Sequence, residues 1–178
     1  MRVIAGEFGR RKLVAPKGDT TRPTPDRMRE ALFSILAPQL EGVAFADFYC
    51  GSGSVGIEAL SRGAARCTFV EKDRAALDAL RENLAALKVG TRAEVIAKPV
   101  GGVIGLRNWK GIVFVDPPYD AFADYEACLE LLGKSEADLV LVQHDRRLKL
   151  PERVGRLSLY RHLKQGDNWV SFYGLGEA

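Results

Sequence analysis

The sequence predicts an α/β fold in which helices cover both faces of a mostly parallel sheet. Short apolar strand patterns alternate with helix patterns through the middle of the chain. Residues 112–115 and 139–142 are continuous apolar runs, which are typical of parallel strands buried on both faces. With 178 residues and 47% hydrophobic content, the chain has the size and composition of one globular domain, so we expect a single domain over residues 1–178.

The first part of the chain predicts a hairpin followed by a helix. Residues 2–14 alternate loosely and contain Gly6 and Gly9, which favours an irregular hairpin within a basic extension over residues 1–23. Thr24 has the character of a capping residue, and Pro25 suits the first position of a helix. Apolar side chains at helical spacing then predict a leading helix over residues 24–38, which ends near Pro38.

The main core is expected over residues 43–178. Its last part alternates polar and apolar residues on both sides of a turn at Gly166, which predicts an antiparallel pair that closes the sheet edge. Helix patterns follow the first, second and fourth strand patterns, as parallel strands require. The strand patterns cover residues 43–49, 67–71, 93–97, 112–115, 139–142, 156–163 and 169–173, and the helix patterns begin at residue 55 or cover 74–87 and 122–132.

Composition argues against several classes of protein. No run approaches the ~18 consecutive apolar residues of a membrane helix, and the first residues lack the apolar segment of a secretory signal. We therefore expect a cytoplasmic protein without a membrane partner. Cys50, Cys67 and Cys128 form no Cys-x-x-Cys pair, and His144 and His162 have no metal-ligand partner at a useful spacing. Neither a disulfide framework nor a metal site is expected.

The formal charge of +3 is unevenly distributed along the chain. Residues 1–30 carry eight Lys or Arg against four Asp or Glu, and residues 146–178 carry seven against three. Residues 31–145 are acidic, with eleven against sixteen. A chain with two basic ends can bind a polyanion if folding brings those ends together on one face. Solvated charge scattered over several faces is the alternative explanation.

The first candidate site is a glycine-rich turn between a strand and a helix. Gly51, Gly53 and Gly56 have the G-x-G-x-x-G spacing that lets a backbone approach a ligand closely. Asp47 ends the preceding strand, where its charge would repel a diphosphate but would suit the amino group of a zwitterionic ligand. Glu71 ends the next strand, where a carboxylate can accept both hydroxyls of a ribose. Together these residues indicate an adenosine-containing ligand without a diphosphate, namely S-adenosylmethionine.

The second candidate site follows the fourth strand. Pro117 and Pro118 have no N–H to donate to a sheet, so the chain must leave the sheet here in a stiff, extended form. Asp116, the Pro117 carbonyl and the Tyr119 ring are then held at the carboxyl edge of the sheet, where α/β proteins bind ligands. A carboxylate and a carbonyl can accept both hydrogens of an exocyclic amino group, and an aromatic ring can stack on the attached base.

These motifs resemble those of a known family. The Asp-Pro-Pro-Tyr run at residues 116–119 is similar to the (Asp/Asn)-Pro-Pro-(Tyr/Phe) signature of S-adenosylmethionine-dependent amino methyltransferases that act on nucleobases. Residues 47–56 resemble the cofactor loop of those enzymes. With the motifs at residues 22–33, 51–63 and 166–167, the chain closely resembles the bacterial 16S ribosomal RNA guanine-N2 methyltransferases over nearly its whole length.

The resemblance implies a Rossmann-like core of seven strands in the order 3-2-1-4-5-7-6, with the last strand antiparallel. It implies methylation of N2 of a guanine in 16S rRNA, with guanine 966 as the named target. The partner is then naked 16S rRNA or a partly assembled small ribosomal subunit, and the enzyme is expected to be a monomer. The implied catalytic residues are Asp116, Pro117 and Tyr119, and the implied cofactor-binding residues are Asp47, Tyr49, Gly51, Ser52, Gly53, Gly56, Glu71 and Lys72.

The basic ends are the expected RNA-binding elements. We expect the N-terminal hairpin and the basic segment at 146–162 to flank the carboxyl edge of the sheet. Lys98-Pro99 leaves no acidic side chain after the third strand, where many methyltransferases hold the adenine amino group, so another group is expected there. The candidate phosphate contacts are Arg2, Arg10, Arg11, Lys12, Arg22 and Arg27.

Two alternative functions stay open on the sequence. A DNA or tRNA amino methyltransferase would share the 116–119 motif, although 178 residues leave no room for a separate domain that reads a DNA sequence. A non-catalytic RNA-binding factor in ribosome assembly would share the fold and use a cofactor for stability alone. The intact Asp116 and Tyr119 argue against that second alternative.

Overall fold

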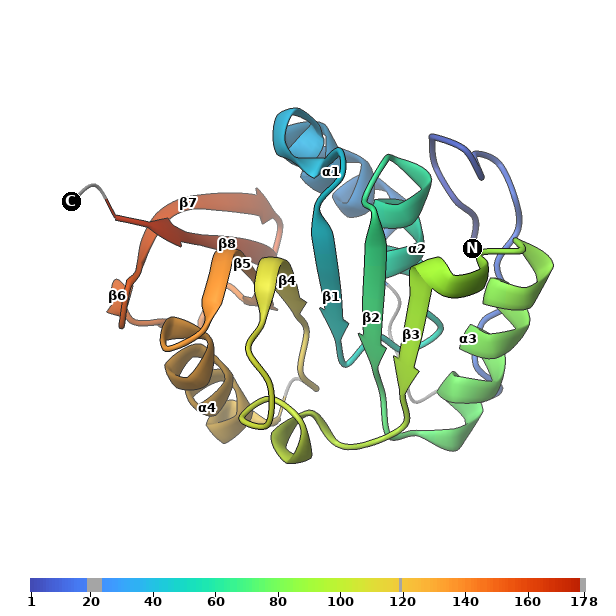
Figure 1. Cartoon of the computed structure of the whole chain (residues 1–178). Coiled ribbons are helices and arrows are strands. Elements are labelled where there is room, and N and C mark those ends of the chain that lie inside the picture. The colour runs from blue at the N-terminus through green and yellow to red at the C-terminus, as the bar shows by residue number, and fades with distance from the viewer. Residues whose placement is uncertain (19–23, 119, 177–178) are drawn as a thin grey trace.

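The structure, a computed structural model, describes residues 1–18, 24–118 and 120–176. Within these ranges, eight strands form one sheet in the order β3-β2-β1-β4-β5-β8-β7-β6 (Figure 1). Strands β1 to β5 are parallel, and β8 is antiparallel to both β5 and β7. The strands are β1 Ala44–Phe48, β2 Arg66–Val70, β3 Ala93–Ile96, β4 Lys110–Val115, β5 Glu136–Asp145, β6 Arg153–Val154, β7 Leu157–Gln165 and β8 Asn168–Leu175.

The expected α/β fold and its mostly parallel sheet are confirmed, with one strand more than the seven expected. Strands β7 and β8 take the places of the sixth and seventh strands, and β8 is antiparallel to β5 as expected. The additional strand β6 has two residues and pairs only with the start of β7 within the described chain. It therefore adds a short outer edge and leaves the rest of the expected order unchanged.

Helices cover both faces of this sheet. In Figure 1, α1, α2 and α3 lie on one face, and α4 lies on the other. No helix of the described chain combines the length and the apolar character needed to cross a membrane. The α-helices are α1 Asp26–Leu40, α2 Ser54–Ser61, α3 Arg74–Ala86 and α4 Phe122–Gly133, and the 3-10 helices are η1 Gly90–Arg92 and η2 Val100–Gly102.

The two apolar clusters explain why the central strands read as continuous apolar runs. Successive side chains of a strand point to opposite faces of the sheet. Ile112 and Phe114 of β4 belong to the cluster beneath α1, α2 and α3. Val113 and Val115 belong to the cluster beneath α4. Because helices cover both faces, the side chains on each face of the strand are buried and apolar. The alternation of polar and apolar residues that marks a strand with one exposed face is therefore lost.

Helix α1 begins and ends two residues later than predicted. Pro25 is the residue before the helix rather than its first residue, and the Thr24 side chain makes no capping hydrogen bond. Its hydroxyl instead donates to the Gln143 side-chain oxygen at 3.2 Å. At the other end the helix continues through Pro38 to Leu40, which is buried in the core. The packing of Leu40 outweighs the missing backbone N–H of the proline.

The predicted N-terminal hairpin is present and packs against the helices. Arg2 and Lys12 form an antiparallel bridge at its base, and the backbone N–H of Val3 donates to the Arg11 carbonyl at 2.9 Å. Near the tip, Glu7 N–H donates to the carbonyl of Ser61, the last residue of α2. Because α2 runs antiparallel to the strands, this contact places the tip at the amino edge of the sheet (Figure 1).

Candidate active site

Three carboxyl groups from distant parts of the sequence meet at the carboxyl edge of the sheet. Strand β1 lies between β2 and β4, in a register that ends all three at the same level. Glu71 directly follows β2, Asp116 directly follows β4, and Asp47 is the second-last residue of β1. The charges of Asp116 and Glu71 both raise the pKa of Asp47, which reflects how close the three groups are.

Asp47 is buried under the glycine turn and hydrogen-bonds to the helix that follows it. Its carboxylate accepts a hydrogen bond from Gly56 N–H at 2.8 Å, and the residue is 1% exposed. Burial raises the pKa of Asp47 well above its usual value, and the Gly56 hydrogen bond partly offsets that rise. The structure thus places Asp47 within the wall of the site, where its observed partner is the first turn of α2.

Two of the three glycines of the turn serve different purposes. Gly51 has a φ of 57°, and a Cβ atom added there would meet nothing within 4 Å, so this part of the turn faces open space. A Cβ atom on Gly56 would lie 2.4 Å from the Phe69 ring. Gly56 is therefore required for close packing of α2 on β2, whereas Gly51 leaves room for a ligand.

The Glu71 carboxylate is held by backbone N–H groups of the glycine turn and of the residues that follow Glu71 in the chain. Its Oε2 accepts a hydrogen bond from Gly51 N–H at 2.9 Å, which links the end of β2 to the glycine turn. Its Oε1 accepts from the backbone N–H groups of Lys72 at 2.8 Å and Asp73 at 2.9 Å. A carboxylate has about four acceptor sites, so Oε2 keeps a site for a further donor.

The other predicted cofactor residues lie around the same turn. Tyr49 is half-buried with a φ of 59°, and its hydroxyl lies 3.7 Å from the Cys128 sulfur. Ser52 is buried, and its carbonyl accepts a hydrogen bond from the Asn83 side chain at 3.1 Å. Lys72 is exposed. Among these residues, Tyr49 also has its pKa raised, mainly because it is partly desolvated by burial.

Asp116 and Pro117 form the opposite side of the site. Asp116 is half-buried, and its carboxylate makes no hydrogen bond within the part of the chain that the structure describes. Burial raises the pKa of Asp116 to about 7. The predicted partner Tyr119 lies outside the described residues, as does the predicted RNA contact Arg22.

The sequence reasoning missed Tyr125, which joins the Pro117 loop to the end of β5. Tyr125 is buried in α4, and its hydroxyl lies 3.5 Å from the Pro117 carbonyl and 3.3 Å from the Gln143 carbonyl. The Gln143 side chain in turn accepts the hydrogen bond from Thr24. No local pattern distinguishes Tyr125 from an ordinary core residue, so only its place in the fold identifies it.

A second missed feature is a buried ionic cluster beneath the glycine turn. Glu58 of α2 and Arg29 of α1 are both 0% exposed, and they lie 3.7 Å apart. Glu58 also accepts hydrogen bonds from the Arg62 side chain at 2.8 Å and from the backbone N–H groups of Ile4 at 2.9 Å and Ala5 at 3.1 Å. This cluster fastens the N-terminal hairpin to α2.

The predicted RNA-binding cations do not all lie near the site. Arg2 and Lys12 are at the base of the hairpin, and Arg2 lies 4.0 Å from Asp26 at the start of α1. Arg27 is exposed at the same end of α1. Arg11 donates to the Ala86 carbonyl at the C-terminus of α3, which is the opposite edge of the sheet. The base of the hairpin therefore lies toward the candidate site, and its tip lies away from it.

Comparison with known proteins gives a consistent result. The family described as conserved hypothetical protein 95 matches residues 1–174. The chain is 35% identical to the putative rRNA methyltransferase YlbH of Bacillus subtilis (strain 168), over 97% of this chain and 98% of that protein. It is 43% identical to ribosomal RNA small subunit methyltransferase D of Escherichia coli (strain K12), over 94% of this chain and 86% of that protein.

Solved structures show the same fold. The putative methyltransferase yhhF from Escherichia coli superposes with a TM-score of 0.85 at 37% identity, covering 98% of this chain and 97% of that one. The putative methylase HI0767 from Haemophilus influenzae superposes with a TM-score of 0.79 at 30% identity, covering 99% of each chain. Fold and site together define a Rossmann-like methyltransferase. The chain belongs to the conserved hypothetical protein 95 family, and both relatives that it resembles carry the names of rRNA methyltransferases.

Proposed function

We propose that the protein transfers a methyl group from S-adenosylmethionine to the N2 amine of a guanine in 16S rRNA. Asp116 is the observation that carries this proposal. Its carboxylate is half-buried at the carboxyl edge, has no hydrogen-bond partner among the described residues, and lies beside the Pro117 carbonyl. The glycine turn and Glu71 lie one and two strands away, on the other side of the same edge.

The residues around the glycine turn fit S-adenosylmethionine. The free acceptor site on Glu71 Oε2 suits a ribose hydroxyl, and the open space above Gly51 suits the approach of a ligand to the backbone. The half-buried Tyr49 and the exposed Lys72 are close neighbours of Gly51 and Glu71 along the chain. When bound, this cofactor supplies a methyl group made electrophilic by its sulfonium charge. The carboxylates at this edge favour that positive charge.

Asp116 and Pro117 would activate the target amine. The lone pair of an exocyclic amine is delocalised into the base, so the amine is a weak nucleophile. Hydrogen bonds from its two N–H groups to the Asp116 carboxylate and the Pro117 carbonyl favour a more tetrahedral nitrogen. They also stabilise the positive charge that grows on that nitrogen, and such preorganised help strengthens toward the transition state. Asp116 need not be a strong base, because the proton can leave after transfer.

Tyr119 is proposed to stack on the target base. A ring at this position, directly after the Asp-Pro-Pro turn, would hold the base in the plane in which its amine reaches Asp116. Replacement of Tyr119 by Phe should then be much milder than replacement by Ala, because stacking needs the ring and not its hydroxyl.

A methyl-transfer assay with defined substrates tests the proposed function. Tritiated S-adenosylmethionine is supplied with small ribosomal subunits from cells that lack the enzyme, with unmodified 16S rRNA, with tRNA and with DNA. We expect label in the subunits or the rRNA, and we expect mass spectrometry of the digested RNA to identify N2-methylguanosine. Mapping the product by primer extension then shows whether guanine 966 is the nucleotide methylated.

The other functions predict different results in the same assay. Label in DNA or tRNA alone would contradict the rRNA proposal and support an amino methyltransferase of that class. Binding to the subunits without any transfer would support a non-catalytic assembly factor. The exposed Asp138 lies at the amino end of β5, so an Asp138→Ala variant serves as the active control for variants of Asp116.

A further inference from the structure

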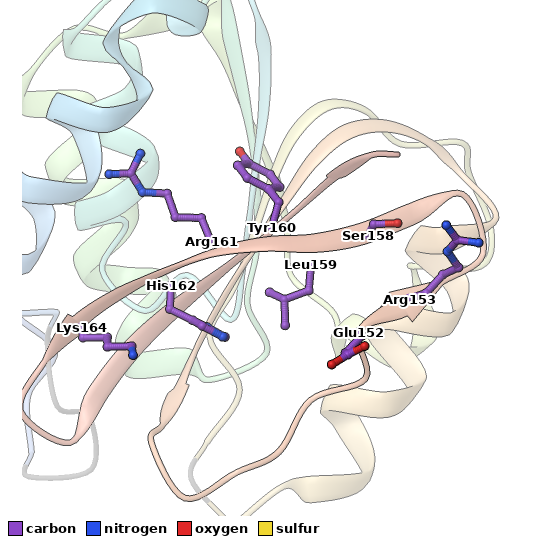
Figure 2. Close-up of a pocket in the computed structure, with 8 residues that line it drawn as sticks. All are labelled: Glu152, Arg153, Ser158, Leu159, Tyr160, Arg161, His162 and Lys164. Carbon is purple, nitrogen blue, oxygen red and sulfur yellow. The ribbon is translucent and has the colours of Figure 1, made fainter. Parts of the chain in front are cut away.

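A basic hollow runs along the outer edge of the sheet, away from the residues discussed so far. It has a volume of about 820 Å³ and follows β7 and the start of β6 (Figure 2). Its lining includes three cationic side chains, Arg153, Arg161 and Lys164, against one carboxylate, Glu152. All four of these residues are exposed. The hollow is therefore a positively charged surface feature.

The cations of the hollow are not neutralised by neighbouring carboxylates. Within the described chain, Arg153, Arg161 and Lys164 form no ion pair, whereas the nearby Arg146 and Arg147 pair with Asp167 and Asp145. Paired arginines contribute little net field at a surface. The unpaired positive charge of the C-terminal segment thus includes Arg161 and Lys164 of β7 and Arg153 of β6.

Aromatic rings hold two of these cations in place. The Lys164 ammonium lies 4.4 Å from the centroid of the Trp169 ring, and the Arg161 guanidinium lies 5.8 Å from that of Phe172. Such contacts restrict the side chain while the charge stays exposed to a ligand. The Tyr160 side chain is 59% exposed, and its ring offers a stacking surface. Figure 2 shows Tyr160 beside Arg161, on the opposite side of β7 from His162 and Lys164.

The outer side of β7 also presents backbone groups. Strand β6 pairs only with Leu157 and Ser158 among the described residues, so residues 160–165 have no strand beyond them. The Gly166 turn after β7 reaches the carboxyl edge, where Arg146 N–H donates to the Asp167 carbonyl at 2.8 Å. Strands lie about 4.8 Å apart, so β7 is only roughly 14 Å from β4 and the proposed target site.

We propose that the hollow along β7 binds the sugar-phosphate backbone of the RNA strand that continues from the methylated nucleotide. Arg153, Arg161 and Lys164 would contact phosphates, and Tyr160 would stack on an unpaired base. This inference rests on the proposed function, because it takes the RNA bound at Asp116 as the strand that reaches β7. The unpaired charge favours a polyanion as the partner.

The salt dependence of RNA binding tests this proposal. Arg161→Gln combined with Lys164→Gln removes two charges from the hollow and leaves uncharged polar side chains in their place. Arg66→Gln combined with Lys88→Gln is the matched control, because those exposed cations lie at the amino edge and form no ion pair among the described residues, and their replacement also removes two charges. Affinity for unmodified 16S rRNA is measured between 0.05 M and 0.5 M salt. Each lost single-strand phosphate contact lowers the log-log slope by about 0.7.

We expect the log-log slope of rRNA affinity against salt concentration to be about 1.4 smaller in the hollow variant than in wild type. If the two affinities become equal near 1 M salt, the variant binds rRNA about 25-fold more weakly than wild type at 0.1 M salt. Its rate of transfer at saturating rRNA should be unchanged, and the control variant should keep the wild-type slope. An unchanged slope in the hollow variant would overturn the proposal.

Two further outcomes separate this inference from the proposed function. If wild-type protein methylates no RNA, the proposed function fails, whereas the comparison of slopes still reports whether β7 contacts RNA. If the hollow variant binds naked rRNA normally but loses activity on small ribosomal subunits, β7 contacts a ribosomal protein. That result would overturn the RNA proposal while the methyltransferase function stands.

Discussion

Asp116 is the residue on which the proposed chemistry depends most directly. Replacing Asp116 by Ala removes the proposed acceptor of the target amine, and the loss of one such preorganised partner costs about 10²–10³ in rate. We expect Asp116→Ala to fold and to bind S-adenosylmethionine nearly normally while single-turnover methyl transfer falls by that factor. Transfer at close to the wild-type rate, with cofactor and RNA saturating, would contradict the assignment of the active site.

The raised pKa of Asp116 predicts a pH dependence of activity. Burial raises this pKa to about 7, and the charged form is the better hydrogen-bond acceptor. We therefore expect kcat/KM to rise as the pH increases through about 7, because the carboxyl group of the free enzyme loses its proton in that range. Asp116→Asn keeps an acceptor oxygen but cannot ionise, so its profile should be flatter. An identical profile in both enzymes would assign the titration to another group.

Glu71 is the proposed ribose contact, and it also accepts a hydrogen bond from the glycine turn. Glu71→Ala removes the proposed ribose contact and the partner of Gly51 N–H, so S-adenosylmethionine binding should weaken by about 1.5–3 kcal/mol. Isothermal titration calorimetry measures this change. The exposed Glu82 of α3 supplies a control, since Glu82→Ala makes the same charge change away from the site. Equal affinities for wild type and Glu71→Ala would show that the ribose is held elsewhere.

At the scale of elements, the buried cluster around Glu58 should dominate the stability of the N-terminal half. Glu58→Gln removes one of the two carboxylates that face the buried Arg29, which keeps its pair with Asp26. The loss of stability should therefore stay below the roughly 3–5 kcal/mol of a buried charge left with no partner. Urea unfolding monitored by circular dichroism measures the loss. Glu130→Gln breaks the exposed pair with Lys134 and should leave the unfolding midpoint close to that of wild type, because solvent screens an exposed ion pair.

The same cluster should control how firmly the hairpin is attached. Because Glu58 accepts the N–H groups of Ile4 and Ala5, Glu58→Gln should also increase hydrogen exchange in residues 1–14. Glu130→Gln should leave exchange in that segment unchanged. A loss of stability without faster exchange in the hairpin would show that Glu58 supports α1 and α2 alone.

At the scale of the whole molecule, the orientation of the hairpin predicts which of its charges bind RNA. Arg2 and Lys12 lie at the base, toward the carboxyl edge, whereas Arg11 contacts the C-terminus of α3 toward the amino edge and Arg10 lies next to it on the side of the hairpin tip. We expect Arg2→Ala with Lys12→Ala to flatten the salt dependence of rRNA binding more than Arg10→Ala with Arg11→Ala. Both variants remove two charges, so each is the control for the other. The reverse order would mean that RNA wraps around the hairpin tip.

Much of the fold was determined by the sequence itself. The alternation of strand and helix patterns determined the α/β class and most element boundaries, because hydrophobic periodicity is a local property. The glycine spacing, Asp47, Glu71 and Asp116 could be placed at one sheet edge, because parallel strands end on the same side. The end of α1 could not be predicted, because the burial of Leu40 depends on its neighbours in the fold.

Only the tertiary structure decided what each polar group contacts. It turned Asp47 toward Gly56, buried Glu58 against Arg29, and left the cations of β7 without carboxylate partners among the described residues. These contacts join residues whose separation along the chain carries no information about their separation in space. The charge and burial that a side chain experiences depend on all the groups that surround it in space. The sequence could therefore name the residues of the site but not the electrostatic environment that folding creates around them.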